Sequence, residues 1–89
     1  MRLHATVRGR VQGVGFRYST LQRARQLDLT GWVANRWDGS VETVAEGPRD
    51  ALEQYLHYLH EGPPAAVVRG VDSSWLAASG EFDGFEVQG

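Results

Sequence analysis

The chain has 89 residues, no cysteine and a formal net charge of -2, and 42% of its residues are hydrophobic. This length fits one domain, residues 1–89, with a single core. The missing cysteines exclude disulfides, thiolate zinc sites and thiol nucleophiles, and the acidic balance disfavours nucleic acid as a partner. Residues 1–10 lack the apolar run of a signal peptide or membrane span, so we expect a cytoplasmic protein with no membrane partner. We also expect it to be a monomer.

An N-terminal strand with one buried face is predicted over residues 3–11, where apolar residues and glycine alternate with polar residues. A glycine-rich turn follows, and then an amphipathic helix is predicted over residues 18–27, with an apolar stripe through Leu21 and Ala24. Asp28 is expected to end this helix in the left-handed conformation, which its short side chain tolerates better than most.

A hairpin and a second helix are predicted next. Residues 30–37 and 40–46 are rich in β-forming residues, and Asp38-Gly39 between them predicts a two-residue hairpin loop. The second helix opens at Pro48 and ends at Gly62-Pro63-Pro64, because proline cannot donate a helical hydrogen bond. Its apolar residues recur at helical spacing and are Leu52, Tyr55, Leu56 and Leu59.

Two further strands are predicted, at residues 67–76 and 85–88. In the longer of them, Val67, Val71 and Trp75 are expected on one face. The order is therefore βαββαβ with a small extra strand, which is typical of the ferredoxin-like fold. This is an α+β sandwich in which an antiparallel sheet carries two helices on one face. The fold serves many functions, so the function must be argued from the site.

The turn between the first strand and the first helix is the candidate anion site. Gly13 and Gly15 let the backbone take positive φ, and Arg17 stands where the helix begins. Converging backbone N–H groups, a helix N-terminus and a guanidinium together suit a phosphate group. A glycine-rich turn also occurs simply to reverse the chain, and its composition does not separate these alternatives.

Metal and RNA sites find little support in the residues. His4, His57 and His60 do not have a recognisable metal-binding spacing, so no metal and no cofactor is expected. The central strands also lack the aromatic and basic pattern of an RNA-recognition module.

Two motifs in this order resemble the acylphosphatase family. The first is GRVQGVGFR at residues 9–17, and the second is GWVANRWDGSV at residues 31–41. The resemblance continues through residues 45–47, 62–64 and 82–85, and so runs almost from end to end. Asp28 and Trp37 depart from the residues that are usual in the family, and Trp37 is expected to pack on the surface.

The resemblance implies a metal-independent hydrolase that converts a small acyl phosphate to a carboxylate and inorganic phosphate. Arg17 matches the family's phosphate-binding arginine, and Asn35 matches the asparagine that orients the attacking water. The loop whose backbone amides hold the phosphoryl oxygens is matched by Val11, Gln12, Gly13, Val14, Gly15 and Phe16.

The residues themselves allow this chemistry. In a loose transition state the phosphoryl group keeps its charge on equatorial oxygens, where fixed N–H donors and an arginine stabilise it. A cysteine phosphatase carries its nucleophilic thiol six residues before its arginine, and the residue at that position here is Val11. Attack by water is therefore the remaining route. Asn35 can hold that water but cannot remove its proton, whose acceptor stays open. The alternative is a non-catalytic phosphate-binding or protein-interaction domain of the same fold.

Overall fold

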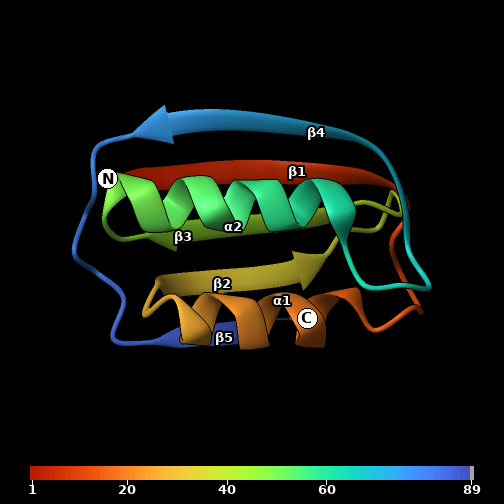
Figure 1. The fold of residues 1–89 in the computed structure, drawn as a ribbon, viewed down its shortest axis with the longest axis horizontal. Coiled ribbons are helices and arrows are strands. Elements are labelled where there is room, and N and C mark those ends of the chain that lie inside the picture. Colours follow the sequence, from red (N-terminus) through yellow and green to blue (C-terminus); the bar gives the residue numbers. More distant parts are fainter. Residues whose placement is uncertain (89) are drawn as a thin grey trace.

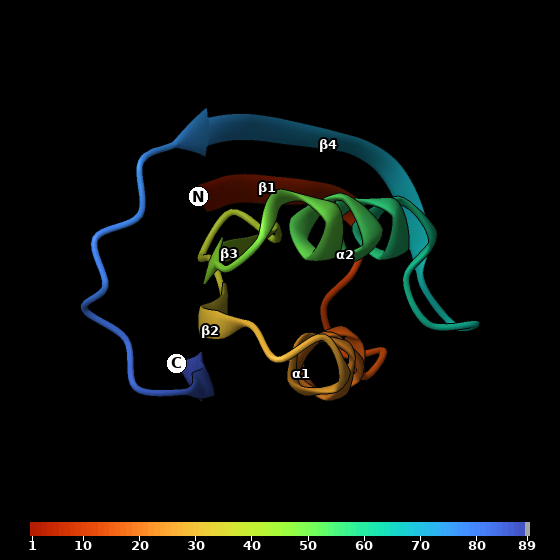
Figure 2. The same cartoon turned by 60° about the vertical axis from the view of Figure 1, so that its left-hand side comes forward.

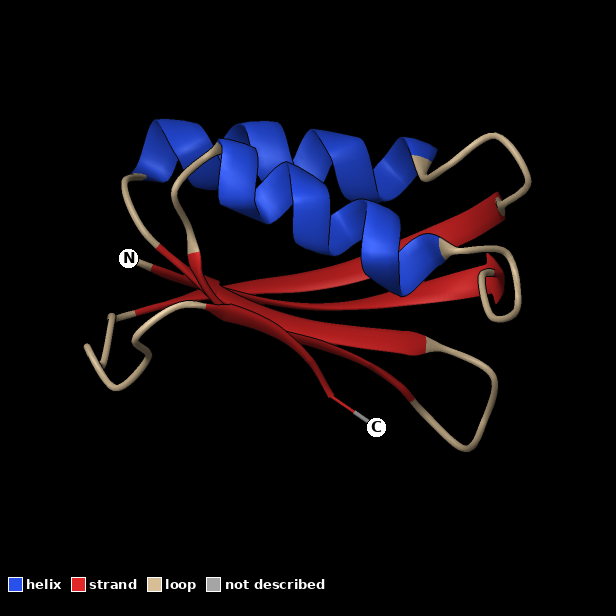
Figure 3. Ribbon diagram, turned by 90° about the horizontal axis from the view of Figure 1, so that it is seen from below, coloured by secondary structure: helices blue, strands red, loops and turns tan. Residues whose placement is uncertain are grey.

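The computed structural model describes residues 1–88, which form a five-stranded sheet and two helices (Figure 1). The elements in chain order are β1 (Arg2–Arg10), α1 (Phe16–Gln26), β2 (Thr30–Asn35), β3 (Val41–Glu46), α2 (Arg49–Glu61), β4 (Val67–Leu76) and β5 (Phe85–Gln88). Both helices lie on the same face of the sheet (Figure 3). The predicted ferredoxin-like fold is therefore confirmed.

The sheet has the strand order β4-β1-β3-β2-β5. β1 pairs antiparallel with β3 and with β4, and β2 pairs antiparallel with β3, as predicted. The small extra strand differs, because β5 pairs parallel with β2. Residues 77–84 cross one end of the sheet, from the end of β4 to the opposite edge (Figure 2). β5 consequently starts at the end where β2 starts, and the complete sheet is mixed.

The helices bury stripes of side chains against the sheet. α2 buries Leu52, Tyr55 and Leu59, which are among the residues predicted for its apolar face. α1 buries Ala24, as predicted, whereas Leu21 is only half-buried. The helix starts two residues earlier than predicted, at Phe16. The buried ring of Phe16 begins a buried stripe in steps of four residues, and the predicted helix did not include this first member of the stripe. Asp28 follows α1 with a φ of 55°, which confirms its predicted left-handed conformation.

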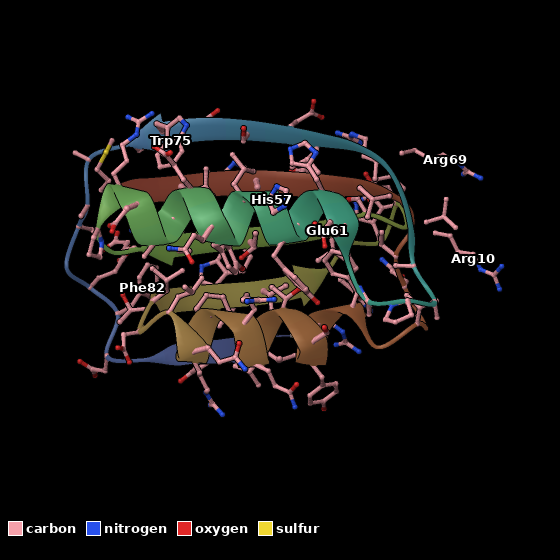
Figure 4. The ribbon with its side chains drawn as sticks, in the orientation of Figure 1. Arg10, His57, Glu61, Arg69, Trp75 and Phe82 are labelled. Carbon is pink, nitrogen blue, oxygen red and sulfur yellow. The ribbon has the colours of Figure 1, made fainter. Side chains whose placement is uncertain are left out.

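A bulge in β4 overturns the predicted face of Val67. Arg8 pairs with Gly70 but Gly9 pairs with Val68, so Arg69 is an extra residue in β4 and its side chain projects outward (Figure 4). An extra residue reverses the alternation of faces along a strand. Val68 packs against the core as a result, as Val71 does, whereas Val67, which was predicted on the same face as Val71, is 50% exposed.

The β2–β3 hairpin has a longer loop than the predicted two-residue turn. The N–H of Arg36 donates to the carbonyl of Ser40 at 2.8 Å, which leaves residues 37–39 in the loop. A two-residue loop of the expected kind needs positive φ at both central residues, but Gly39 has a φ of 92° and Asp38 has no positive φ. Trp37 therefore lies in the loop itself, where it is 95% exposed rather than packed on the surface as predicted.

A buried carboxylate, Glu46, ties the connection 77–84 to the sheet. It accepts hydrogen bonds from the backbone N–H groups of Ser79 (2.9 Å) and Gly80 (3.0 Å), and from Nε of Arg2 (2.7 Å). Burial raises the pKa of Glu46, but the hydrogen bonds favour the ionised form more strongly and lower the pKa from 4.5 to about 2.

The change Glu46→Gln is expected to remove a contribution to stability that depends on pH. The pKa of Glu46 is lower in the folded state than in the unfolded state, so its ionised form stabilises the fold above about pH 4.5, and this contribution is lost as the pH falls towards 2. The difference in unfolding free energy between wild type and variant should shrink by roughly 2 to 3 kcal/mol between about pH 5 and pH 2. Urea unfolding at each pH measures it, and a constant difference would contradict this assignment.

Candidate functional site

The turn between β1 and α1 has the left-handed backbone conformation that its glycines predict. We call residues 11–16 the cradle. Gly13 has a φ of 74° and Gly15, the N-cap of α1, has a φ of 79°. A Cβ atom at either position would meet nothing within 4 Å. The backbone conformation therefore requires glycine here, and the space beside the two residues is open.

The N-terminus of α1 supplies donors at the cradle. The first hydrogen bond at this end of the helix runs from the N–H of Ser19 to the carbonyl of Gly15, at 3.1 Å. The amides of Phe16, Arg17 and Tyr18 precede it, and the first turn contains no acidic residue. Amides in this position carry the positive end of the helix dipole. Together with the cradle they form a suitable place for an anion.

A cavity of about 180 Å³ lies against the cradle and the start of α1. Its lining residues are Val11, Gly13, Gly15, Phe16, Arg17, Tyr18 and Asn35. Six of the eight residues predicted for the site are thus brought together around one small space. Val11 and Phe16 are each only 1% exposed, so the two ends of the cradle are fixed in the core.

Asn35 reaches this cavity from the end of β2. It lies two residues after Val33, which is completely buried, and so shares the face of the sheet that the helices cover. Its carboxamide oxygen Oδ1 is buried and has no hydrogen-bond partner among residues 1–88. Such an atom is uncommon, because a buried acceptor without a donor costs free energy. Asn35 thus lines the cavity with an acceptor whose hydrogen-bonding capacity is unused among residues 1–88.

Two predicted residues do not line the cavity, and one residue was missed. Val14 packs its side chain against the core, and Gln12 directs its carboxamide to the β2–β3 hairpin. Tyr18, which does line the cavity, is 64% exposed and was not predicted. Its position in the first helical turn, directly after Arg17, was the signal that could have found it.

Ionisable groups near the cavity are engaged elsewhere. Arg36, which follows Asn35, forms an ion pair with Glu42, and Glu42 also contacts His4 at 2.6 Å. The hydrogen bond from His4, and then that from Arg36, hold the pKa of Glu42 below its usual value despite partial burial. The lining of the cavity itself contains neither a carboxylate nor a histidine. It can hold and orient charge, but it lacks the side-chain types that most often act as general acids and bases.

A second, larger cavity of about 480 Å³ lies on the helical side and is bordered mainly by α2. Its lining includes His57 and Glu61, whose side chains contact each other at 3.0 Å on α2 (Figure 4). It contains none of the residues predicted for the site. Within residues 1–88, no group of three or more histidines and carboxylates could hold a metal ion. Neither helix of this part of the chain is long and apolar enough to cross a membrane.

Comparison with known proteins gives consistent matches. A family model described as acylphosphatase matches residues 3–87. An acylphosphatase of Salinibacter ruber is 55% identical, over 98% of this chain and 92% of that protein. The crystal structure of an acylphosphatase from Bacillus subtilis has a TM-score of 0.94 and 37% identity, and the match covers 98% of this chain and 97% of that one. HypF of T. kodakarensis is 30% identical with a TM-score of 0.84, but the match covers only 12% of its chain.

Proposed function

Because the chain belongs to the acylphosphatase family, we propose that its cradle and Arg17 bind the phosphoryl group of an acyl phosphate while Asn35 orients the attacking water. The observation that carries this proposal is that Arg17, Asn35 and the two glycines of the cradle line one cavity at the start of α1. The family and the fold support acyl phosphate hydrolysis in general, and the assignment of these residues to steps is our proposal.

Binding rests on positioned positive charge. The cradle amides and the N-terminus of α1 face the phosphoryl oxygens, and the guanidinium of Arg17 adds paired, charge-assisted hydrogen bonds. These donors are fixed before the substrate arrives, because Val11 and Phe16 hold the cradle in the core. Donors that need no rearrangement are the ones that stabilise charge in a transition state most effectively.

The chemical step is an in-line displacement at phosphorus. Oδ1 of Asn35 accepts a hydrogen bond from a water molecule and aims its oxygen at the phosphorus atom. A bond forms between that oxygen and phosphorus, and the bond from phosphorus to the acyl oxygen breaks with its electron pair. The acyl group leaves as a carboxylate and the phosphoryl group as inorganic phosphate. The proton of the water passes to a phosphate oxygen or to solvent, since Asn35 cannot take it.

The proposed reaction needs few catalytic side chains because its leaving group is a carboxylate. A carboxylate is a stable anion at neutral pH and departs without a proton. No general acid is then required, which fits a lining without carboxylate or histidine. We propose on the same grounds that the reaction needs no metal ion, because Arg17 and the amides supply the positive charge.

Incubation of the purified protein with benzoyl phosphate tests the proposal. Loss of benzoyl phosphate should exceed the rate without protein and should be the same with and without a chelator. No excess over background would remove the proposed function, and sensitivity to the chelator would remove its metal independence. The second candidate, a non-catalytic phosphate-binding or interaction domain, is favoured by the match to a small part of the HypF chain. Binding of phosphate without hydrolysis would support it.

A further inference from the structure

The side chain of Gln12 connects the cradle to the hairpin that carries Asn35. Its Nε2 donates to the carbonyl oxygen of Arg36 at 2.6 Å and to that of Ser40 at 2.9 Å. A carboxamide nitrogen has two N–H donors, so both are used in joining these two parts of the chain. Figure 1 shows that the cradle, between β1 and α1, and the β2–β3 loop lie at the same end of the molecule.

The two carbonyl groups that Gln12 binds form the base of the hairpin loop. The carbonyl of Arg36 also accepts the N–H of Gly39 at 3.2 Å, and the carbonyl of Ser40 accepts the N–H of Arg36 at 2.8 Å. Arg36 directly follows Asn35 in the chain. Gln12 therefore holds the carbonyl group of the residue that directly follows Asn35, the residue that we propose orients the water.

The cradle and the hairpin differ in how else they are anchored. Val11 and Phe16 are buried on either side of Gln12, and Val14 packs against the core. The hairpin loop is held mainly by polar contacts, the Arg36–Glu42 ion pair and hydrogen bonds from Ser40 to Asp38, while Trp37 is 95% exposed. Loss of the Gln12 side chain should therefore free the hairpin more than the cradle.

We infer that Gln12 is a positioning residue that sets the carboxamide of Asn35 relative to the bound phosphoryl group. The inference rests on the proposed function. The sequence motif implied a role for the backbone amide of Gln12. This inference adds a role for its side chain. A displacement of about 1 Å at a reacting group can lower the rate about a hundredfold. Loss of the Gln12 side chain should therefore lower turnover, whereas the affinity of the fixed cradle for phosphate should persist.

Two variants test this role. Gln12→Ala removes the side chain, and Gln12→Met keeps its length but has no N–H donor. Both should lower kcat for benzoyl phosphate by about 10- to 100-fold, while the inhibition constant of inorganic phosphate changes by less than about threefold. Gln26→Ala, at the exposed far end of α1, is the matched control and should behave like wild type.

The outcomes separate this inference from the proposed function. An active wild type together with unchanged kcat in both variants would overturn the role of Gln12 alone. Equal losses of turnover and phosphate affinity would show that Gln12 supports the cradle, and unfolding of both variants would show a purely structural role. Either result overturns the inference. A wild type that does not hydrolyse benzoyl phosphate would remove the proposed function and this role with it.

Discussion

The variant Asn35→Ala is expected to bind phosphate as wild type does and to lose nearly all turnover. The phosphate ligands that we propose, the cradle amides and Arg17, are untouched by the change, so the inhibition constant of inorganic phosphate should stay within about threefold. The variant lacks the acceptor Oδ1, so water reaches phosphorus without orientation, and kcat should fall by at least about a hundredfold. Steady-state kinetics with benzoyl phosphate, with phosphate as competitive inhibitor, measures both constants.

A second variant at this position separates orientation from charge. Asn35→Asp has nearly the same shape but places a carboxylate beside the anion, and like charges repel. It should lose phosphate affinity as well as turnover, in contrast to the alanine variant. Thermal unfolding of both variants checks that the fold persists. Turnover within a few-fold of wild type in Asn35→Ala would remove Asn35 from the proposed mechanism.

The fold was largely predictable because its signals are local. Alternation around Leu3 gave the first strand, and prolines marked both ends of α2. The bulge at Arg69 was not predictable, because it depends on how β4 meets β1, and no residue of β4 alone encodes that register. The Asp38-Gly39 dipeptide predicted the hairpin correctly but not the length of its loop. A three-residue loop also ends with glycine in the left-handed conformation, so the dipeptide does not distinguish the two lengths.

The sequence motifs predicted which residues belong to the candidate site, but they did not predict the side-chain contacts between distant parts of the chain. Arg17 and Asn35 are far apart in the chain, and the fold brings both to one cavity, while their roles there stay predictions. The sequence named Gln12 for its backbone amide, but a contact from its side chain to the hairpin depends on tertiary distances. Trp37 was expected to pack on the surface, yet its place in the loop leaves it 95% exposed.

Arg17→Ala is expected to weaken phosphate binding and turnover together. Arg17 lines the cavity from the first turn of α1, where a guanidinium supplies paired hydrogen bonds to phosphate oxygens in both the ground state and the transition state. The charge on these oxygens persists in a loose transition state, so losing the guanidinium should cost kcat/KM about 10²- to 10³-fold and should raise the inhibition constant of phosphate by about tenfold or more. Kinetics and phosphate titration on one preparation give both values.

Two comparisons show whether the guanidinium itself is responsible. Arg17→Lys keeps the positive charge but loses the planar fork, so its affinity and rate should fall between those of wild type and Arg17→Ala. Arg23→Ala removes an exposed arginine of the same helix that stacks on Tyr58, 5.2 Å from the ring centre, outside the cavity. It should leave the kinetics unchanged. If Arg17→Ala lost turnover but kept full phosphate affinity, Arg17 would act on the chemical step alone, and the cradle amides would have to hold the phosphoryl group without it.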